Sequence, residues 1–497
     1  MLRLLFACSV SLCVLGATEE TATQQRPNVL LLLVDDLKPA IGAYGDPLAV
    51  TPNIDRLATR SVRFDFAYCN QSVCAPSRNN LLLGSRSTSL GIYSLSQNFR
   101  QAVPDAVTLP QYFMRHGYRA EALGKILHVG HGNTDDRASW SVDPVPAQVV
   151  EYLLPESTSG GQLTREEAYF SNQQLGSIRD LPRGAAWEHP DVEDTDYADG
   201  RVAEEGVRRL EQAKEREGVP FFLALGFVKP HLPFTAPQKY WDLHDPAKFA
   251  PPPPRSHPED APPFAGKRGG EIVNYAPLTV ENLQEESMWR TLMHGYYASA
   301  SYADAQIGKV LDALDRLELT DNTLVVLWGD HGWHLGDHGY WTKHTNYEQA
   351  NRIPLLFAGP GIDATGRVTE QLAETVDIFP TLVELAGLPP ADVPQPIDGV
   401  SLAPTLRDTR ARVRDHATHC YPRGARLGRA IRTERYRLVE WKEPGDSVEN
   451  AIYELYDYQE DPHETRNLAA LNPELRAELQ AILARHPEAK PPLRRRR

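Results

Sequence analysis

Four apolar stretches, each followed closely by polar residues, are the feature of this sequence that most restricts its fold. The stretches cover residues 29–34, 118–123, 221–227 and 324–328. The polar residues that follow them are, in order, Asp35-Asp36, Lys125 and His128, Lys229 and His231, and Asp330-His331. Open parallel sheets bind ligands beyond the carboxyl ends of their strands. The pattern therefore predicts one polar site, built from segments that lie far apart in the sequence.

The same stretches predict the fold class. Residues 29–34 are continuously apolar rather than alternating, which suits a strand buried on both faces of a parallel sheet. Helical periodicity follows at 54–64, again at 77–83 after Pro76, and as a long amphipathic pattern at 297–317. Strands that alternate with helices indicate an α/β protein with a large, mostly parallel sheet sandwiched by helices.

The pattern changes near residue 415. Residues 429–441 and 451–458 alternate as antiparallel strands do, and residues 473–486 form a terminal amphipathic helix. We therefore expect a large domain that carries the site over 26–410, a smaller C-terminal α+β domain on an antiparallel sheet over 411–490, and a basic tail over 491–497. Prolines exclude regular structure from 247–266 and favour a surface insertion there over a loop on the substrate side.

Residues 1–17 have the pattern of an export signal. Arg3 supplies the positive start, residues 4–15 the apolar centre, and Gly16-Ala17 the small residues before cleavage. The short signal and the single glycosylation sequon, at Asn70, favour a bacterial periplasmic or extracellular protein over a lysosomal one. No later stretch is apolar over the roughly 18 residues that a membrane span requires. The formal net charge of -14 argues against nucleic-acid binding.

Carboxylates dominate two of the four polar clusters. Asp35, Asp36 and Asp330 at strand ends suggest a hard divalent cation bound through oxygen, although an Asp pair can also cap a helix. Three carboxylates favour calcium or magnesium over zinc, because zinc sites depend on His and Cys. Taken together, the clusters are typical of a hydrolase for an anionic ester.

Cys74 opens the sequence Cys74-Ala75-Pro76-Ser77-Arg78, at the start of a predicted helix. Removal of the signal would leave an odd number of cysteines (Cys69, Cys74 and Cys420), so at least one stays unpaired. Three interpretations of Cys74 stay open: a thiolate nucleophile with a histidine partner, a buried inert thiol, or a target of the C-x-P-x-R pattern, which directs oxidation of cysteine to formylglycine. The predicted helix N terminus would favour an anion beside it.

The sequence also resembles the type I sulfatases of the alkaline phosphatase superfamily through most of its length. The segments that carry the resemblance are Pro27-Asn28-Val29, Asp35-Asp36, Thr51-Pro52-Asn53, Cys74-Ala75-Pro76-Ser77-Arg78, Gly124-Lys125, Lys229-Pro230-His231, Asp330-His331-Gly332, Trp341-Thr342-Lys343 and Glu454-Leu455-Tyr456-Asp457. Within the family it is most similar to the iduronate-2-sulfatase branch, which has His where many sulfatases have Asn at position 331. His334 and the middle and C-terminal segments depart from that branch.

The resemblance implies a site with one Ca²⁺ ion and a formylglycine formed from Cys74. The residues implied as metal ligands are Asp35, Asp36, Cys74, Asp330 and His331. A hydroxyl of the hydrated formylglycine would attack sulfur, Lys125 and Lys343 would bind the sulfate, and Arg78 would hold the diol. His231, alone or with Lys343, would protonate the leaving oxygen, and His128 would remove a proton so that the aldehyde returns. Candidate substrate contacts are His334, His338, His344 and Arg423, the last chosen for its charge and its place in the smaller domain.

The resemblance implies hydrolysis of a sulfuric ester on a saccharide, first of all the 2-O-sulfate of a uronic acid such as iduronate. A formylglycine-generating enzyme would be the partner during maturation. Choline sulfate, aryl sulfates, and phosphonate or phosphate esters stay open as alternative substrates, because related sites share the metal. A non-catalytic module that binds sulfated glycans would have lost site residues, and a cysteine-dependent hydrolase would be inactivated by alkylation of its thiol.

Overall fold

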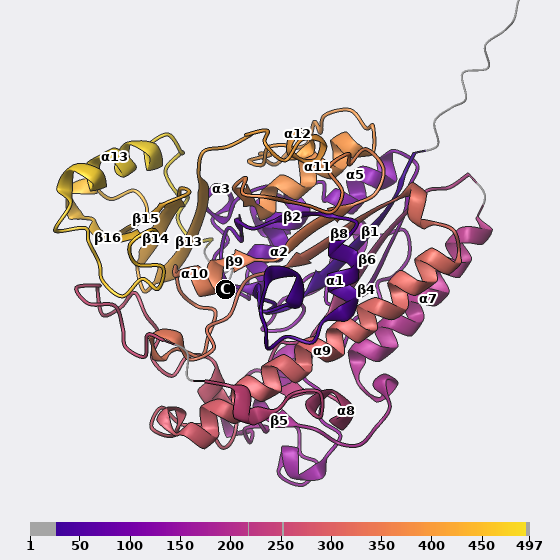
Figure 1. Cartoon of the computed structure of the whole chain (residues 1–497), viewed down its shortest axis with the longest axis horizontal. Helices are drawn as coiled ribbons and strands as arrows, with labels where there is room; N and C mark the ends of the chain where they lie inside the picture. Colours follow the sequence, from indigo (N-terminus) through magenta and orange to yellow (C-terminus); the bar gives the residue numbers. More distant parts are fainter. Residues whose placement is uncertain (1–25, 217, 251–252, 494–497) are drawn as a thin grey trace, which may run out of the picture.

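The computed structural model describes residues 26–216, 218–250 and 253–493, so the expected signal at 1–17 and the end of the basic tail lie outside the described residues. A seven-stranded sheet forms the centre of the larger part, with the strand order β11-β2-β10-β8-β1-β6-β4 (Figure 1). Its strands are β1 (Asn28–Val34), β2 (Val62–Phe64), β4 (Arg119–Gly124), β6 (Phe221–Phe227), β8 (Thr323–Gly329), β10 (Leu355–Ala358) and β11 (Arg367–Thr369).

The four apolar stretches of the sequence are the neighbouring strands β8, β1, β6 and β4. β1 pairs in parallel with β8 on one side and with β6 on the other, and β4 pairs in parallel with β6. β10 runs antiparallel to β8, so the complete sheet is mixed but mostly parallel. Because the four strands are parallel neighbours, their carboxyl ends meet at one edge, as predicted.

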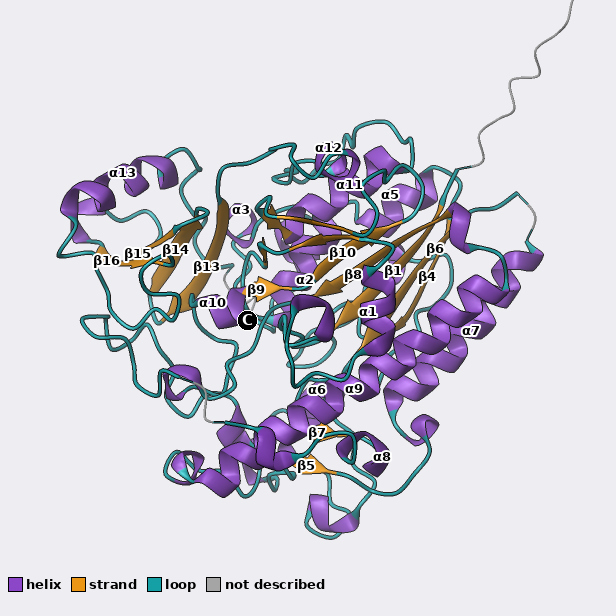
Figure 2. Cartoon of the chain, in the orientation of Figure 1, coloured by secondary structure: helices purple, strands orange, loops and turns teal. Residues whose placement is uncertain are grey.

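Helices cover both faces of the sheet (Figure 2). Alternate residues of β1 enter two separate cores: Val29, Leu31 and Leu33 pack on one side, and Leu30, Leu32 and Val34 on the other. The first face is covered by α2 (Cys74–Leu83), α5 (Leu109–Arg115) and α11 (Ile378–Leu385). The second face is covered by α1 (Pro52–Ala58), α7 (Ala198–Glu215) and α9 (Glu286–Arg316). A strand buried on both faces has to be apolar throughout, which explains the continuous apolar stretch.

Local periodicity misplaced several helix ends: the long helix expected over 297–317 is α9, which already begins at Glu286, and the terminal helix expected over 473–486 ends at Leu483. The helix expected over 54–64 is the shorter α1, and residues 62–64 form β2 because they pair with β10 and β11 in the sheet. The helix expected from residue 77 begins at Cys74, with Pro76 in its first turn, where the missing N–H of proline is tolerated.

The remaining short elements frame the larger part. They are β3 (Ala67–Tyr68), β5 (Trp187–Glu188), β7 (Phe234–Thr235), β9 (Arg352–Ile353), β12 (Ala373–Glu374), α3 (Ser87–Leu90), α4 (Phe99–Ala102), α6 (Arg165–Ser171), α8 (Gln238–Trp241), α10 (Glu348–Asn351) and α12 (Ala403–Arg407). α6 matters most for function, because it lies beside the carboxyl ends of β4 and β6 through contacts described below.

The C-terminal part is a separate four-stranded antiparallel sheet with one helix packed on it. Its elements are β13 (Ala417–Arg423), β14 (Arg426–Arg432), β15 (Tyr436–Lys442), β16 (Ile452–Asp457) and α13 (Pro473–Leu483). Leu438 and Leu455 of the sheet share a core with Leu479 and Leu483 of the helix. The α/β part and the smaller α+β part together confirm the predicted fold class.

Buried ion pairs join the two parts. Arg437 of β15 is fully buried and contacts both Glu348 of α10 and Glu464, at 2.6 Å each. The two carboxylates hold the buried guanidinium in place, because moving it away would leave buried charges without a partner.

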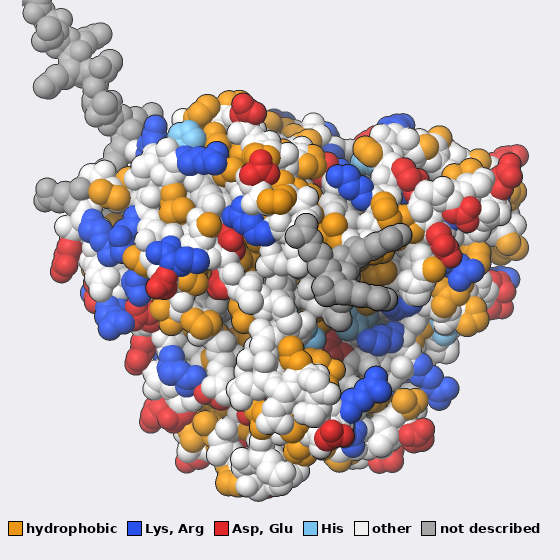
Figure 3. All heavy atoms as spheres, turned by 180° about the vertical axis from the view of Figure 1, so that it is seen from behind, with side chains coloured by type: hydrophobic (Ala, Val, Ile, Leu, Met, Phe, Trp, Pro, Cys, Tyr) orange, Lys and Arg blue, Asp and Glu red, His pale blue; other side chains and the backbone are white. Residues whose placement is uncertain are grey.

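The described residues include no helix with both the length and the apolar composition needed to cross a bilayer. On the face shown in Figure 3, acidic and basic side chains are interspersed rather than gathered by sign.

Candidate active site

The carboxyl ends of β1 and β8 place three carboxylates together. Asp35 and Asp36 follow β1, and Asp330 follows β8; their exposed fractions are 0%, 1% and 0%. Asp36 has a positive φ of 60°, which turns its backbone sharply at the strand end. The Asp36 amide donates to Asp330 Oδ1 at 3.0 Å, so the two strand ends are tied directly to each other.

Helix α2 brings Cys74 and Arg78 against these carboxylates. Cys74 Sγ lies 3.3 Å from His331 Nε2. Arg78, one turn later, donates from Nε to Asp330 at 3.0 Å and from Nη2 to Asp35 at 3.1 Å. Its Nη1 also donates to the backbone carbonyl of Lys125. One buried guanidinium therefore connects the ends of β1, β4 and β8.

Two lysines supply the rest of the positive charge. Lys125, after β4, is ion-paired with Asp35. Lys343 donates to Asp36 Oδ1 at 3.0 Å and lies 3.2 Å from Glu271 Oε2. The backbone at 124–125 reaches this position only because β6 has Gly226 beside it: a Cβ there would lie 2.2 Å from the Lys125 carbonyl oxygen.

The carboxylates do not share this charge equally. Burial would raise the pKa of Asp35, but Lys125, His231 and Arg78 outweigh it and hold that pKa well below its usual range. Burial raises the pKa of Asp36 well above its usual value despite Lys343, and burial with Asp35 nearby raises the pKa of Asp330 to about 7. At Asp36 and Asp330, the nearby positive charge of Lys343 and Arg78 does not fully offset burial and the neighbouring carboxylates.

The same cluster fits a hard cation. Asp35, Cys74, Asp330 and His331 each offer a ligand atom, and these atoms lie within 4.8 Å of one another. His331 Nδ1 is 3.1 Å from the carbonyl oxygen of Gly332, which leaves Nε2 facing Asp36 at 3.4 Å and Asp330 at 3.5 Å. Carboxylate oxygens are the ligands that calcium and magnesium prefer.

The loops after β4 and β6 bring two histidines to the same edge. His128 Nε2 lies 3.1 Å from Nδ1 of His131, whose ring stacks on Tyr169 of α6 at 4.7 Å. His231 Nδ1 contacts the carbonyl oxygen of Leu232 at 2.5 Å, so Nε2 is the nitrogen that faces the site. Burial and the nearby Lys125 lower the pKa of both histidines well below its usual value.

Phe170 of α6 lies between these groups. Its ring is 5.1 Å from Lys125 Nζ, 5.5 Å from the His128 ring and 5.5 Å from the His231 ring. An aromatic ring here packs three polar side chains against one another and limits the space open to water.

A cavity of about 810 Å³ adjoins the cluster. Residues that line it are Val73, Tyr93, Gln97, Gln101, His131, Tyr169, His344, Tyr421, Pro422 and Leu493. Val73 precedes Cys74, and His131 contacts His128, so the cavity lies beside Cys74 and His128. Its walls come from both parts of the chain.

Of the four residues predicted to contact the substrate, His344 is the one found in the wall of this cavity. His334 is not: its Nδ1 is bonded to Asp337 and its Nε2 contacts Thr345 Oγ1 at 2.8 Å. His338 contacts the carbonyl oxygen of Ser256. Arg423 donates to the carbonyl oxygens of Phe264, Ala265 and His344, so its guanidinium fixes the loops beside the cavity.

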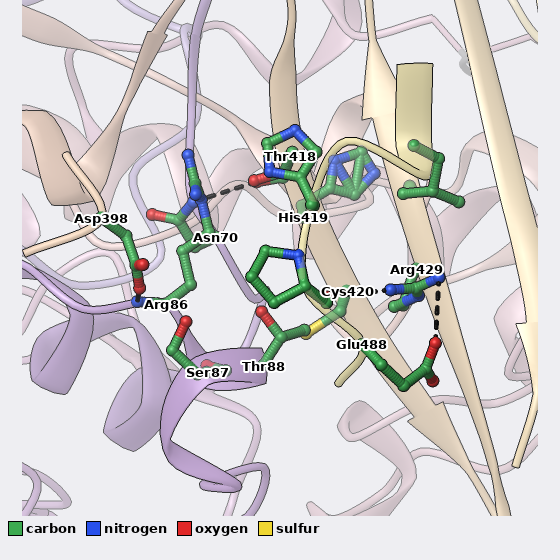
Figure 4. A pocket seen from close by; sticks show the side chains of 15 residues that line it. Asn70, Arg86, Ser87, Thr88, Asp398, Thr418, His419, Cys420, Arg429 and Glu488 are labelled. Atoms are coloured by element: carbon green, nitrogen blue, oxygen red, sulfur yellow. Dashed lines mark hydrogen bonds and ion pairs between the residues drawn. The ribbon is translucent and has the colours of Figure 1, made fainter. Parts of the chain in front are cut away.

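A second cavity, of about 40 Å³, lies between α3 and the sheet of the smaller part (Figure 4). Its two arginines already have carboxylate partners: Arg86 contacts Glu374 at 2.8 Å, and Arg429 contacts Glu440 at 2.8 Å. This cavity belongs to the interface between the two parts.

Comparison with known proteins agrees with this geometry. The sulfatase family profile matches residues 27–388, and a profile described as the C-terminal part of N-sulphoglucosamine sulphohydrolase matches residues 336–488. The chain belongs to the sulfatase family. It is similar to iduronate 2-sulfatase of Mus musculus, with 32% identity over 91% of this chain and 92% of that protein. It is also similar to the Homo sapiens enzyme, with 34% identity over 76% of this chain and 72% of that protein.

Solved structures share the fold. A phosphonate monoester hydrolase of Agrobacterium radiobacter superposes with a TM-score of 0.70 at 23% identity, covering 93% of this chain and 96% of that one. A structure in complex with its substrate, D-glucosamine-2-N,6-O-disulfate, superposes with a TM-score of 0.69 at 21% identity, covering 93% and 97%. The protein is thus a type I sulfatase with the alkaline phosphatase-like fold, in the iduronate-2-sulfatase branch, and its reaction is hydrolysis of sulfuric esters.

Four residues of this sulfatase lie at the site without having been predicted from the sequence. They are His131, Phe170, Lys267 and Glu271. His131 follows His128 closely and could have been found as a second histidine of one loop. The other three follow no apolar stretch and belong to no motif, so nothing local in the sequence indicates that they reach this edge.

Replacement of Arg78 tests whether one guanidinium holds the cluster together. Arg78→Leu leaves Asp35 and Asp330 buried without that partner, which should lower the apparent free energy of unfolding of the larger part by about 3–5 kcal/mol. Urea denaturation followed by tryptophan fluorescence measures it. Arg410→Leu, which removes an exposed arginine paired with Asp408, is the control and should change little. Equal effects of the two substitutions would contradict the role given to Arg78.

Proposed function

We propose that this sulfatase removes the 2-O-sulfate of a uronic acid, iduronate first of all, from a saccharide outside the bacterial cytoplasm. The observation that carries the proposal is the convergence of Cys74, three carboxylates, His331 and two lysines at one buried edge of the sheet. The similarity to iduronate 2-sulfatases over most of the chain supports this substrate, and the signal pattern at 1–17 supports the location.

Oxidation of Cys74 to formylglycine is part of the proposal. The C-x-P-x-R pattern supports it, and so does the position of Cys74 at the first turn of α2, where free N–H groups favour negative charge. Burial, reinforced by Asp35, raises the pKa of the unmodified thiol well above its usual value, which disfavours a thiolate nucleophile. The modification would supply a hydrated aldehyde as the oxygen nucleophile.

We propose Ca²⁺ as the metal, held by Asp35, Asp36, Asp330, His331 and the modified residue 74. Bound there, the ion would polarise the sulfate oxygens. It would also supply positive charge to Asp36 and Asp330, which the nearby basic side chains do not fully neutralise.

The chain's own side chains then divide the remaining work. Lys125 and Lys343 flank the carboxylates and would bind the sulfate oxygens, neutralising charge in the transition state. His231, with Nε2 facing the site, would give a proton to the leaving oxygen. His128 would take a proton from the second hydroxyl of the hydrated residue 74, so that the aldehyde returns, and the contact with His131 fixes the His128 ring.

The alternatives receive less support. A non-catalytic module should lack some of these residues, and all of them are present. Other esters stay as alternative substrates, including phosphonates, since a phosphonate monoester hydrolase shares the fold.

A uronate also carries a carboxylate, and we propose that Lys267 binds it. Lys267 Nζ donates to Nδ1 of His344, a residue of the cavity wall, at 2.8 Å. Among the described residues Lys267 forms no ion pair within 4 Å, and the carboxylate whose charge acts on it is Glu271. Arg423 supports the arrangement by holding the backbone at Phe264, Ala265 and His344.

The mass of the peptide that contains residue 74 tests the modification. Protein made together with a formylglycine-generating enzyme should yield a tryptic peptide over residues 64–78 that is lighter by about 18 Da, because a thiol and a hydrogen are replaced by a carbonyl oxygen. Peptide mass spectrometry measures it, with Cys74→Ala as the unmodifiable control. An unchanged thiol, in cells that convert a control sulfatase, would refute this mechanism.

Removal of the metal tests the calcium site. Dialysis against EGTA should lower kcat by about a hundredfold or more, because the ion is the main source of positive charge at the sulfate. Added Ca²⁺ should restore activity and raise Tm, measured by an ester assay and by differential scanning fluorimetry. Full activity in protein shown to be free of metal would contradict the proposal.

Replacement of Lys267 tests the carboxylate contact. Lys267→Met should raise KM for a 2-O-sulfated uronide by about 10- to 100-fold, as expected for loss of a charged hydrogen bond. The carboxyl-reduced analogue of the same sugar should be unaffected. Lys248→Met, at an exposed lysine, is the matched control. A KM that rises equally for both sugars would show that Lys267 does not bind the carboxylate.

A further inference from the structure

Glu271 is a carboxylate of the site that is outside the metal cluster. Its side chain is 13% exposed; Oε1 lies 3.8 Å from His231 Nε2, and Oε2 lies 3.2 Å from Lys343 Nζ. Oε2 is buried and has no hydrogen-bond partner among the described residues. Glu271 thus contacts the two side chains proposed to act on the leaving oxygen.

The backbone around Glu271 is built to hold it there. Gly270 has a φ of 61°, and a Cβ at that position would lie 2.4 Å from the Trp341 carbonyl oxygen, so the loop packs directly on the segment that leads to Lys343. Just after Glu271, Ile272 and Tyr275 are fully buried in a core with Trp341. The loop is therefore anchored on both sides of Glu271.

Glu271 is not a member of the metal cluster and lies mainly among positive and protonatable groups. Positive or protonatable groups near it are Lys343, Lys267, His231 and His131, and the carboxylates that face it are Asp36 and Glu166 of α6. Asp36 and Glu271 contact Lys343 from two directions. Lys343 is therefore held between a carboxylate of the proposed metal cluster, Asp36, and a carboxylate outside it, Glu271.

We propose that Glu271 is a positioning residue that holds His231 and Lys343 toward the bridging oxygen of the ester, and that this arrangement suits the site to esters of alkyl alcohols, such as sugar hydroxyls, more than to aryl sulfates. The inference rests on the proposed sulfatase function. An alkoxide is a poor leaving group and needs a proton as it departs, whereas a nitrophenolate leaves without one.

The step that Glu271 supports is balanced within the site. The hydroxyl at residue 74 gives its proton to a neighbouring carboxylate of the cluster and forms a bond to sulfur, while the bond between sulfur and the bridging oxygen breaks. The electron pair of the broken bond stays on that oxygen. The oxygen takes a proton from Nε2 of His231 in its imidazolium form, in which Nδ1 donates to the Leu232 carbonyl oxygen and Nε2 faces Oε1 of Glu271, and it leaves as an alcohol. Glu271 touches neither sulfur nor the bridging oxygen; it acts through His231 and Lys343.

Substrates with different leaving groups test the proposal. Glu271→Gln keeps the shape of the side chain and removes its charge. In metal-loaded, modified enzyme we expect kcat for the best-cleaved sugar sulfate to fall by about 10- to 100-fold, within the range that general acid catalysis supplies. We expect kcat for 4-nitrophenyl sulfate to stay within about threefold, and KM for the sugar sulfate to change little. Steady-state kinetics on both esters give these values.

Two further variants test whether Glu271 positions His231 and Lys343 or only stabilises the loop. Glu259→Gln changes an exposed glutamate of the same loop and should leave both activities intact. Gly270→Ala should displace Glu271 without changing its charge and should reproduce the selective loss on the sugar sulfate. Equal losses on both esters, or no loss on either, would overturn the inference. Wild-type enzyme inactive on every sulfate ester would instead overturn the proposed function itself.

Discussion

The structure depends on keeping three buried carboxylates, Asp35, Asp36 and Asp330, at one edge of a sheet. Like charges at this distance repel one another, and burial adds a desolvation cost to each. Arg78 and the two lysines compensate most of this charge, and the raised pKa values of Asp36 and Asp330 show that they do not compensate all of it. The Ca²⁺ ion that we propose would supply positive charge here, so an arrangement that is costly for the protein alone would become favourable with the ion bound.

Much of the surrounding fold holds these charged side chains in fixed positions. Parallel pairing of β8, β1, β6 and β4 brings their ends to one edge, and Gly226 lets the chain at Lys125 approach β6 closely. Asp199, at the start of α7, accepts from the backbone amides of Val228 and Lys229 at 2.7 and 2.8 Å and so fixes the loop that carries His231. Each loop that delivers a reactive group is thus tied to the sheet or to a helix packed on it.

The proline-rich segment has a role that its composition did not reveal. Residues 247–266 were expected to form a surface insertion, and prolines do keep regular structure out of most of it. The chain that follows turns back on Gly269 and Gly270 and brings Lys267 and Glu271 to the site, where Arg423 of the smaller part holds the loop. In the function that we propose, contacts with the sugar would thus come from this loop and the smaller part together, whereas the groups proposed to act on the sulfate follow the strands of the sheet.

The sequence by itself determined the sheet, its buried strands and the meeting of Asp35, Asp36 and Asp330 at one edge, because apolar periodicity and strand-end chemistry are local properties that remain readable without coordinates. It also determined the antiparallel sheet of the C-terminal part through its alternating pattern. Only the tertiary structure decided that residues 62–64 form a strand, that His334 faces Asp337 and Thr345, and that Phe170, Lys267 and Glu271 reach the site. Those outcomes depend on pairing and packing between segments distant in sequence, which no local pattern records.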